Sequence, residues 1–183
     1  MPDLYLFNKP YGVISQFTEL DGASSLSEFI QIPNIYPAGR LDKDSEGLLL
    51  LTNNGKLQHK ISNPAKKMEK TYWVQVEGIP DENTLDILKH GVKLKDGLTL
   101  PAKARLIDET EISGKLWPRN PPIRFRANIP TAWLEIKIKQ GKNRQVRRMT
   151  AAVGFPTLRL IRYAIGEWTV DNVKLGQFKH IIV

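Results

Sequence analysis

Two short segments of the 183-residue sequence carry side chains that could do chemistry. The first, residues 39–42, reads Gly-Arg-Leu-Asp and places a carboxylate in a glycine-bearing connection just before an apolar strand. Because such a connection can present a side chain rigidly to a cleft, Asp42 is a candidate catalytic carboxylate. The alternative is a turn-capping aspartate, with Arg40 paired to Asp44 or Glu46, and loop aspartates of that kind are common.

The second segment, residues 140–149, reads Gln-Gly-Lys-Asn-Arg-Gln-Val-Arg-Arg-Met. It predicts a helix over 142–153 that opens with bases, although the helix dipole favours acids there. Such a helix start directs cations and free backbone N–H groups toward phosphate. Arg144, Arg147 and Arg148 are three and four residues apart, so on a helix they would share one face. The alternative is a solvated basic helix end.

The charge distribution agrees with a polyanionic partner. Residues 1–100 hold 11 Lys/Arg and 13 Asp/Glu, a net charge of −2, whereas residues 101–183 hold 16 and 6, a net charge of +10. Between Glu135 and Glu167 there is no acid but eight cations: Lys137, Lys139, Lys142, Arg144, Arg147, Arg148, Arg159 and Arg162. Protein surfaces normally intersperse the two signs, so this stretch predicts nucleic acid as partner. The alternative is a set of cations that solvate one face.

Several classes of function are excluded or disfavoured. The absence of cysteine excludes disulfides, thiolate nucleophiles and iron–sulfur clusters. The three histidines lack metal-ligand spacing, and no Gly-x-Gly-x-x-Gly or P-loop occurs, so we expect no metal and no nucleotide cofactor. No apolar run approaches the ~18 residues of a membrane span, and the amino terminus does not resemble a signal peptide. We therefore expect a cytoplasmic protein without cofactors that does not bind membranes.

The elements that must position the two segments are mainly strands. Apolar patterning predicts strands at Tyr5–Phe7, Leu48–Thr52, Lys70–Glu77, Thr99–Ile107, Ala132–Lys139, Leu158–Tyr163, Trp168–Val170 and Phe178–Val183. Helices are predicted over 25–30, where Ser-Leu-Ser-Glu matches a capping box, over 56–62, from Pro80 to Gly91 and over 142–153. Strands outnumber helices without regular alternation, which predicts an α+β fold with a mixed, mainly antiparallel β-sheet and flanking helices. The Pro/Arg-rich segment 113–130 is predicted to be a long loop.

Two further motifs make the sequence recognisable as a whole. Lys-Pro-Tyr-Gly occupies residues 9–12 and Lys-Thr-Tyr residues 70–72, and with the two segments above they form four motifs in a fixed order. The sequence resembles the RNA pseudouridine synthases, in the RsuA-like branch that acts on ribosomal RNA. The resemblance covers nearly the whole chain. It implies the family's catalytic fold with a central active-site cleft, in one catalytic domain over 1–183 or in two subdomains that share one sheet.

The resemblance also implies an activity, the isomerisation of a specific uridine to pseudouridine in ribosomal RNA, with the large-subunit RNA as the expected substrate. Carried over by motif, Asp42 matches the catalytic aspartate, Tyr72 the tyrosine that lies against the target base, and Arg147 the basic residue that pairs with the aspartate. For Tyr72 the alternative is a core tyrosine on the strand face of Val74 and Val76. The expected RNA contacts are Lys9, Arg40, Arg119, Arg124, Arg126, Lys142, Arg144 and Arg148.

The sequence departs from many members of this branch at its amino terminus. It starts directly at the Lys-Pro-x-Gly motif, so we expect no separate N-terminal RNA-binding domain. RNA binding is then expected from the catalytic domain itself, acting as a monomer. Two other functions stay open. A non-catalytic RNA-binding or ribosome-assembly module needs the basic segment but neither Gly-Arg-Leu-Asp nor Lys-x-Tyr, and a carboxylate-based glycosidase fits a cationic surface poorly.

Overall fold

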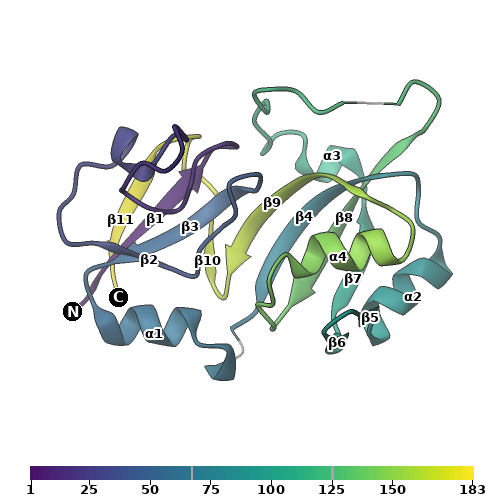
Figure 1. The fold of residues 1–183 in the computed structure, drawn as a ribbon, viewed down its shortest axis with the longest axis horizontal. Helices are drawn as coiled ribbons and strands as arrows, with labels where there is room; N and C mark the ends of the chain where they lie inside the picture. Colours follow the sequence, from purple (N-terminus) through teal and green to yellow (C-terminus); the bar gives the residue numbers. More distant parts are fainter. Residues whose placement is uncertain (67, 125) are drawn as a thin grey trace. The chain divides into compact units, whose positions relative to one another are not determined.

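The computed structural model describes residues 1–66, 68–124 and 126–183, and the chain divides into two compact units (Figure 1). Unit 1 is formed by Met1–Met68 together with Arg162–Val183, and unit 2 by Glu69–Ile161. Strand β9 (Thr157–Ile165) begins in unit 2 and ends in unit 1. Each unit carries some of the predicted site residues, and each is described by itself.

Unit 1 is built on antiparallel strands. β1 (Asp3–Lys9) pairs with β11 (Phe178–Ile182) on one side and with β3 (Glu46–Thr52) on the other, and β2 (Tyr36–Ala38) also pairs with β3. β10 (Trp168–Thr169) pairs with the end of β9. Helix α1 (Gly55–Ser62) packs against β2 and β3, and the short 3-10 helices η1 (Leu26–Glu28) and η2 (Pro64–Lys66) complete the unit.

Burial of β3 organises the core of unit 1. Every residue of β3 is buried, because four consecutive leucines supply apolar side chains to both faces of the strand. One face forms a cluster with the loops that follow β1, whose buried members are Phe7, Val13, Leu26, Ile30, Ile35, Leu41, Leu49 and Leu51. Leu41, the residue before Asp42, is therefore anchored in this core.

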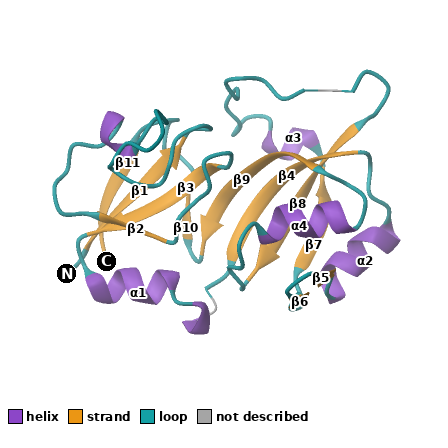
Figure 2. Ribbon diagram, viewed as in Figure 1, coloured by secondary structure: helices purple, strands orange, loops and turns teal. Residues whose placement is uncertain are grey.

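The described residues of unit 2 contain three helices, two of which pack against an antiparallel sheet (Figure 2). β8 (Thr131–Ile138) lies between β4 (Lys70–Glu77) and β7 (Lys103–Ile107), and β5 (Lys93–Leu94) with β6 (Gly97–Leu98) forms a separate hairpin. The helices are α2 (Glu82–His90), α3 (Glu109–Ile112) and α4 (Gln145–Ala152). Val74, Val76, Leu134 and Ile136 of the sheet share one core with Leu85 and Leu88 of α2 and Val146 and Met149 of α4.

The predicted fold class is confirmed: the structure is α+β with mainly antiparallel pairing. β4 has the predicted bounds, and the described residues of segment 113–130 contain no helix or strand. The capping-box helix at 25–30 is wrong, because it is a single 3-10 turn whose Ser25 makes no capping bond; its Oγ donates instead to Phe17 O at 3.3 Å. In the part of the chain that the structure describes, no helix is long and apolar enough to cross a membrane.

Candidate active site

The loop between β2 and β3, which carries Asp42, has its backbone fixed at five consecutive carbonyl groups. Arg162 donates to the first two, from Nη2 to Gly39 O at 2.8 Å and from Nη1 to Arg40 O at 3.4 Å. Leu41 O accepts from Ser15 Oγ at 2.5 Å, and Asp42 O accepts from Ser45 N at 3.1 Å. Lys43 O accepts from Gly12 N at 2.8 Å and from Lys9 Nζ at 3.4 Å. The Asp42 side chain is exposed. A carboxylate open to solvent is thus carried on a loop whose peptide groups cannot rotate without losing hydrogen bonds.

Arg162 is the side chain that joins this loop to the sheet. It is only 4% exposed, and its Nε also donates to Leu48 O of β3 at 2.9 Å. Its guanidinium therefore donates to carbonyls at both ends of the loop. A buried guanidinium is tolerated only when its donors are satisfied, so the position of Gly39 and Arg40 is tied to a cation inside unit 1. The sequence predicted that Arg162 would face a polyanion, and it serves the protein's own backbone instead.

Lys9 is a second buried basic side chain that donates hydrogen bonds to backbone carbonyls, including that of Lys43 in the Asp42 loop. It is fully buried, and its ammonium donates to Val13 O at 2.6 Å and Pro10 O at 2.9 Å besides Lys43 O. Burial lowers the pKa of Lys9 to about 7, against the attraction of Glu46, Asp44 and Asp42, with repulsion from Arg162 acting in the same direction as burial. The expectation that Lys9 contacts RNA is corrected, because its three donors are directed at carbonyls and none of the side chain reaches the surface.

Arg40 is placed differently from both buried cations. Its backbone carbonyl belongs to the fixed loop, but its side chain is exposed and donates to Gln16 Oε1 at 3.1 Å. A guanidinium has further donors beyond that bond. Unit 1 therefore brings two of the predicted site residues, Arg40 and Asp42, together on one loop with their side chains at the surface.

In unit 2, Tyr72 lies on β4 opposite Ile136 of β8 and is half-buried against the core. This packing is what the core-tyrosine alternative predicts for the ring. Within residues 1–66, 68–124 and 126–183, however, no group makes a hydrogen bond to the Tyr72 hydroxyl. Buried tyrosines usually pair their hydroxyl with a protein group. The ring is thus held by the core, while the hydroxyl stays available to a bound molecule.

The basic segment that precedes α4 is braced by two glutamines. Gln145, which is 3% exposed, donates from Nε2 to Gln140 Oε1 at 3.0 Å, and its Oε1 accepts from Lys142 N at 3.3 Å. Gln140 Oε1 also accepts from Leu100 N at 2.9 Å. These bonds fold residues 140–145 into a fixed loop ahead of the helix. Neither glutamine was a predicted site residue, although both lie in the motif that was recognised.

The helix begins three residues later than predicted. Arg144 is the N-cap of α4 and adopts the left-handed conformation, with φ 49° and ψ 35°. Non-glycine residues occupy this region only when the surroundings impose it, at a cost of about 1 kcal/mol or more. Arg144 therefore does not share a helix face with Arg147 and Arg148, but its side chain is exposed. Arg147 lies in the first turn of α4 and is half-buried.

Two predicted RNA contacts of this segment bind the β5–β6 hairpin. Arg148 donates to both carboxylate oxygens of Asp96, at 2.7 and 3.3 Å, and to Asn143 O at 2.9 Å. The Arg148 hydrogen bonds hold the pKa of Asp96 below its usual range. Lys142 Nζ lies 3.5 Å from Asp96 O. Arg148 is therefore committed to a structural ion pair, whereas Lys142 reaches the hairpin through this one long contact.

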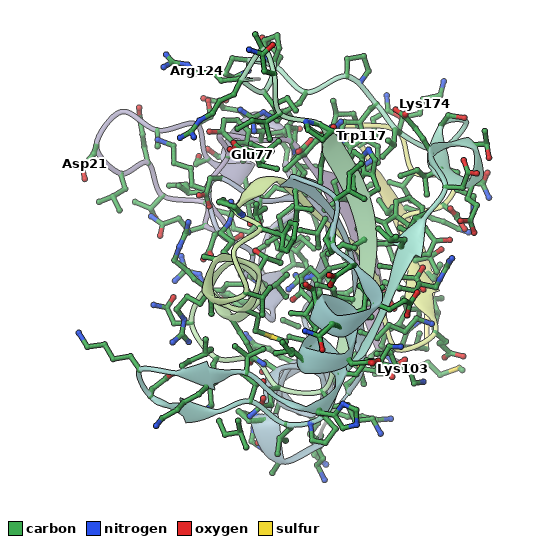
Figure 3. All side chains as sticks on the ribbon, turned by 90° about the vertical axis from the view of Figure 1, so that its right-hand side faces the viewer. Asp21, Glu77, Lys103, Trp117, Arg124 and Lys174 are labelled. Carbon is green, nitrogen blue, oxygen red and sulfur yellow. The ribbon has the colours of Figure 1, made fainter. Side chains whose placement is uncertain are left out.

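The three arginines of the 113–130 loop also divide between structure and surface. Arg119 donates to Pro121 O at 2.8 Å and to Leu158 O at 3.2 Å, and Arg126 pairs with Glu77 at 3.6 Å. Arg124 is exposed and extends away from the ribbon, as Figure 3 shows. Buried Arg159 donates to Trp117 O at 2.7 Å, so it too serves the protein's own backbone. Of the loop's predicted RNA contacts, Arg124 is the one best placed to reach a phosphate.

The chain belongs to the RNA pseudouridylate synthase family, whose model matches residues 3–152 and so includes all four motifs. A ribosomal large subunit pseudouridine synthase E of Vibrio parahaemolyticus is 57% identical over 176 residues, 96% of this chain and 72% of that protein. A protein of the same name from Xanthomonas campestris pv. campestris is 54% identical and is matched over 96% of this chain and 94% of its own length. A crystal structure of a pseudouridylate synthase has 27% identity and a TM-score of 0.81, covering 100% of this chain and 71% of that one. The family inferred from the motifs is confirmed.

No group of three His, Cys, Asp or Glu side chains that could hold a metal ion occurs among the described residues. The groups that donate hydrogen bonds to the carbonyls of the Asp42 loop are two cations, a hydroxyl and backbone N–H groups. What this arrangement supplies is an exposed carboxylate on a loop whose backbone is held by hydrogen bonds.

The burial of Lys9 predicts a specific pH dependence of stability. Its pKa falls from 10.5 in the unfolded chain to about 7 in the folded one, so between these values the unfolded state binds the additional proton and stability rises with pH. Relative to Lys9→Met, the wild type should gain on the order of 1 kcal/mol of unfolding free energy per pH unit between pH 7 and 10. Urea unfolding of both proteins at several pH values measures this, and parallel curves would contradict it.

Removal of Arg162 should loosen the Asp42 loop more than the rest of unit 1. Arg162→Met leaves three carbonyls, one of them buried, without this donor, and we expect a loss of about 2–4 kcal/mol in unfolding free energy. Hydrogen exchange of the backbone amides at 40–45 should rise more than exchange in β1, because the loop loses its brace directly. Lys174→Met, at an exposed position of the same unit, is the control. Unchanged exchange in the loop would show that Arg162 does not fix it.

Proposed function

We propose that this protein isomerises a uridine of large-subunit ribosomal RNA to pseudouridine, with Asp42 as the catalytic carboxylate. The observation that carries the proposal is the exposed Asp42 side chain on a loop with five consecutive hydrogen-bonded carbonyls. Family membership supplies the reaction class, and the relatives above are synthases of the large ribosomal subunit. A non-catalytic RNA-binding module would have no use for such a rigidly held carboxylate.

The reaction suits a site that offers a carboxylate and cations. The N1–C1′ bond of uridine breaks, the uracil turns, a new bond joins C5 to C1′, the proton on C5 leaves and N1 gains a proton. No atom is gained or lost overall and no electron is transferred, so the chemistry requires no redox cofactor. An ionised carboxylate can take part as a nucleophile or by accepting a proton from the sugar. Either role depends on its position relative to the reacting carbon, which explains the value of a fixed loop.

Tyr72 and Arg147 are proposed as the other two catalytic residues, on the family motifs that carry them. The ring of Tyr72 offers a face for stacking on the flipped uracil, and its hydroxyl, unbonded to any described residue, can donate or accept a proton. The guanidinium of Arg147 stays charged at every working pH, and such a group stabilises an ionised carboxylate. The core packing of Tyr72 supports the proposed role of its ring, because the packing keeps the ring from turning.

Four exposed or half-exposed cations are proposed to bind the phosphates that surround the target: Arg40, Arg124, Lys142 and Arg144. A flipped uridine costs a few kcal/mol of lost stacking, which phosphate contacts and stacking on Tyr72 would offset. We also propose that the protein acts as a monomer in the cytoplasm, where ribosomal RNA is available. The direct test is incubation with unmodified large-subunit ribosomal RNA, followed by mass-spectrometric detection of pseudouridine; its absence would contradict the proposal.

Asp42→Asn should abolish isomerisation while leaving RNA affinity and folding nearly unchanged. The substitution keeps the shape of the side chain and its place in the loop but removes the negative charge. A tritium-release assay on RNA labelled at uridine C5 measures turnover, and binding of the same RNA is measured in parallel. Asp44→Asn, two residues along the same loop, is the matched control and should stay active. Turnover near the wild-type rate in Asp42→Asn would remove this residue from the mechanism.

Tyr72→Phe separates the two functions of one side chain. Stacking is worth ~1–3 kcal/mol per base and should be retained by phenylalanine, so any loss belongs to the hydroxyl. If Tyr72 is catalytic, the Phe variant binds RNA and melts like the wild type but has a much lower single-turnover rate. If Tyr72 is only a core residue, Phe is nearly silent and Tyr72→Ala mainly lowers Tm. A fast and stable Phe variant would therefore refute the catalytic role.

A further inference from the structure

A second group of cations gathers in unit 1, in a stretch of the sequence outside the four motifs. Helix α1 runs alongside β2 (Figure 1), and Lys56, His59 and Lys60 are spaced three and four residues apart on it. With Gly55 and with Lys66 of η2, they line a pocket of about 470 Å³. All four basic side chains are exposed. We call this group the α1 pocket.

The charge of the α1 pocket is not neutralised by the protein. Between Glu46 and Glu69 the sequence contains four lysines and no acid. In the part of the chain that the structure describes, no carboxylate forms an ion pair with Lys56, Lys60 or Lys66. This separates them from Arg126 and Arg148, which have acidic partners. The net charge of −2 over residues 1–100 had concealed this local excess of positive charge.

His59 provides a further hydrogen-bond donor beside the three lysine ammonium groups. Asn63 Oδ1 accepts from Ala65 N at 3.0 Å, which orients the amide so that its Nδ2 donates to His59 Nε2 at 2.9 Å. With Nε2 accepting, the neutral imidazole carries its proton on Nδ1. An N–H donor among three ammonium groups matches the acceptor oxygens of a phosphodiester.

The helix itself indicates which polyanion fits. The apolar residues of α1, Leu57 and Ile61, are half-buried and buried, so they face the protein and leave no apolar side chains to insert into lipid. An amphipathic helix that binds membranes does the opposite and exposes its apolar face between its cations. The pocket therefore favours a hydrated polyanion over a lipid surface.

We propose that the α1 pocket binds backbone phosphates of the RNA substrate, as a contact additional to those at the candidate active site. This inference rests on the proposed function, since it takes RNA to be the substrate. Phosphate contacts position a nucleic acid without taking part in the chemistry. Removal of the pocket's charges is thus expected to change affinity and its salt dependence, but not the rate of the bound complex.

The test compares two charge-matched double variants of unit 1. Lys56→Gln/Lys60→Gln removes two charges from the pocket, and Lys174→Gln/Lys179→Gln removes two exposed charges from elsewhere in the same unit. Binding of a large-subunit ribosomal RNA fragment is measured by fluorescence anisotropy over a range of salt. At ~0.7 counterions released per phosphate contact, the slope of log K against log salt should become shallower by about 1.4 in the pocket variant only. Lys56→Arg/Lys60→Arg should keep the wild-type slope.

Several results would overturn the proposal. Equal losses in both Gln pairs would indicate a general effect of net charge, and an unchanged pocket variant would show that RNA does not reach α1. Loss of binding to phosphatidylglycerol vesicles with RNA binding unchanged would assign the pocket to membranes. A lower single-turnover rate at saturating RNA would place it in the reaction itself. The binding assay does not require turnover, so it tests the pocket independently of catalysis. A wild type that binds RNA but forms no pseudouridine would refute the proposed function without refuting RNA binding at the pocket.

Discussion

The structure of the candidate site depends on two buried cations that donate to backbone carbonyls. Arg162 and Lys9 approach the Asp42 loop from different parts of unit 1, and each would be costly to bury without acceptors. The dependence is mutual: the cations need the carbonyls of Gly39, Arg40 and Lys43, and these carbonyls lie correctly only while the cations are present. The result is a loop with five consecutive hydrogen-bonded carbonyls, although only Leu41 contributes an apolar side chain to the core.

Unit 2 holds its loop with neutral groups. Gln140 and Gln145 bind each other and the amides of Leu100 and Lys142, and they hold the segment that turns into α4. The choice of amides over cations has a physical reason. The segment is itself rich in lysine and arginine, so further buried cations would repel their neighbours, whereas an amide donates and accepts without adding charge. The loop that carries a carboxylate is held by cations, and the loop that carries cations is held by amides.

Sequence patterns predicted what depends on neighbours along the chain. The alternation of Lys70–Glu77 gave β4 with its observed bounds, and four motifs identified the family and its candidate residues. The errors at the basic residues concern the groups that their side chains contact. Arg159, Arg162 and Lys9 have the charge of RNA-binding residues, and only the fold shows that their acceptors are carbonyls. The left-handed backbone conformation of Arg144 could not be predicted from the sequence either, because the loop before it imposes that conformation. One local pattern was missed: Asp108 and Glu111 form a capping box at the start of α3, a helix that was not predicted.

The bond from Arg162 to Gly39 joins residues 123 positions apart in the sequence, and β1 pairs with β11, which is made later still. Unit 1 therefore cannot be completed on the ribosome until β11 has been synthesised, whereas unit 2 is one continuous segment that emerges earlier. During synthesis the Asp42 loop exists without its guanidinium brace. The Asp42 loop therefore acquires its full set of hydrogen bonds only after Arg162 and the strands that follow it have been synthesised.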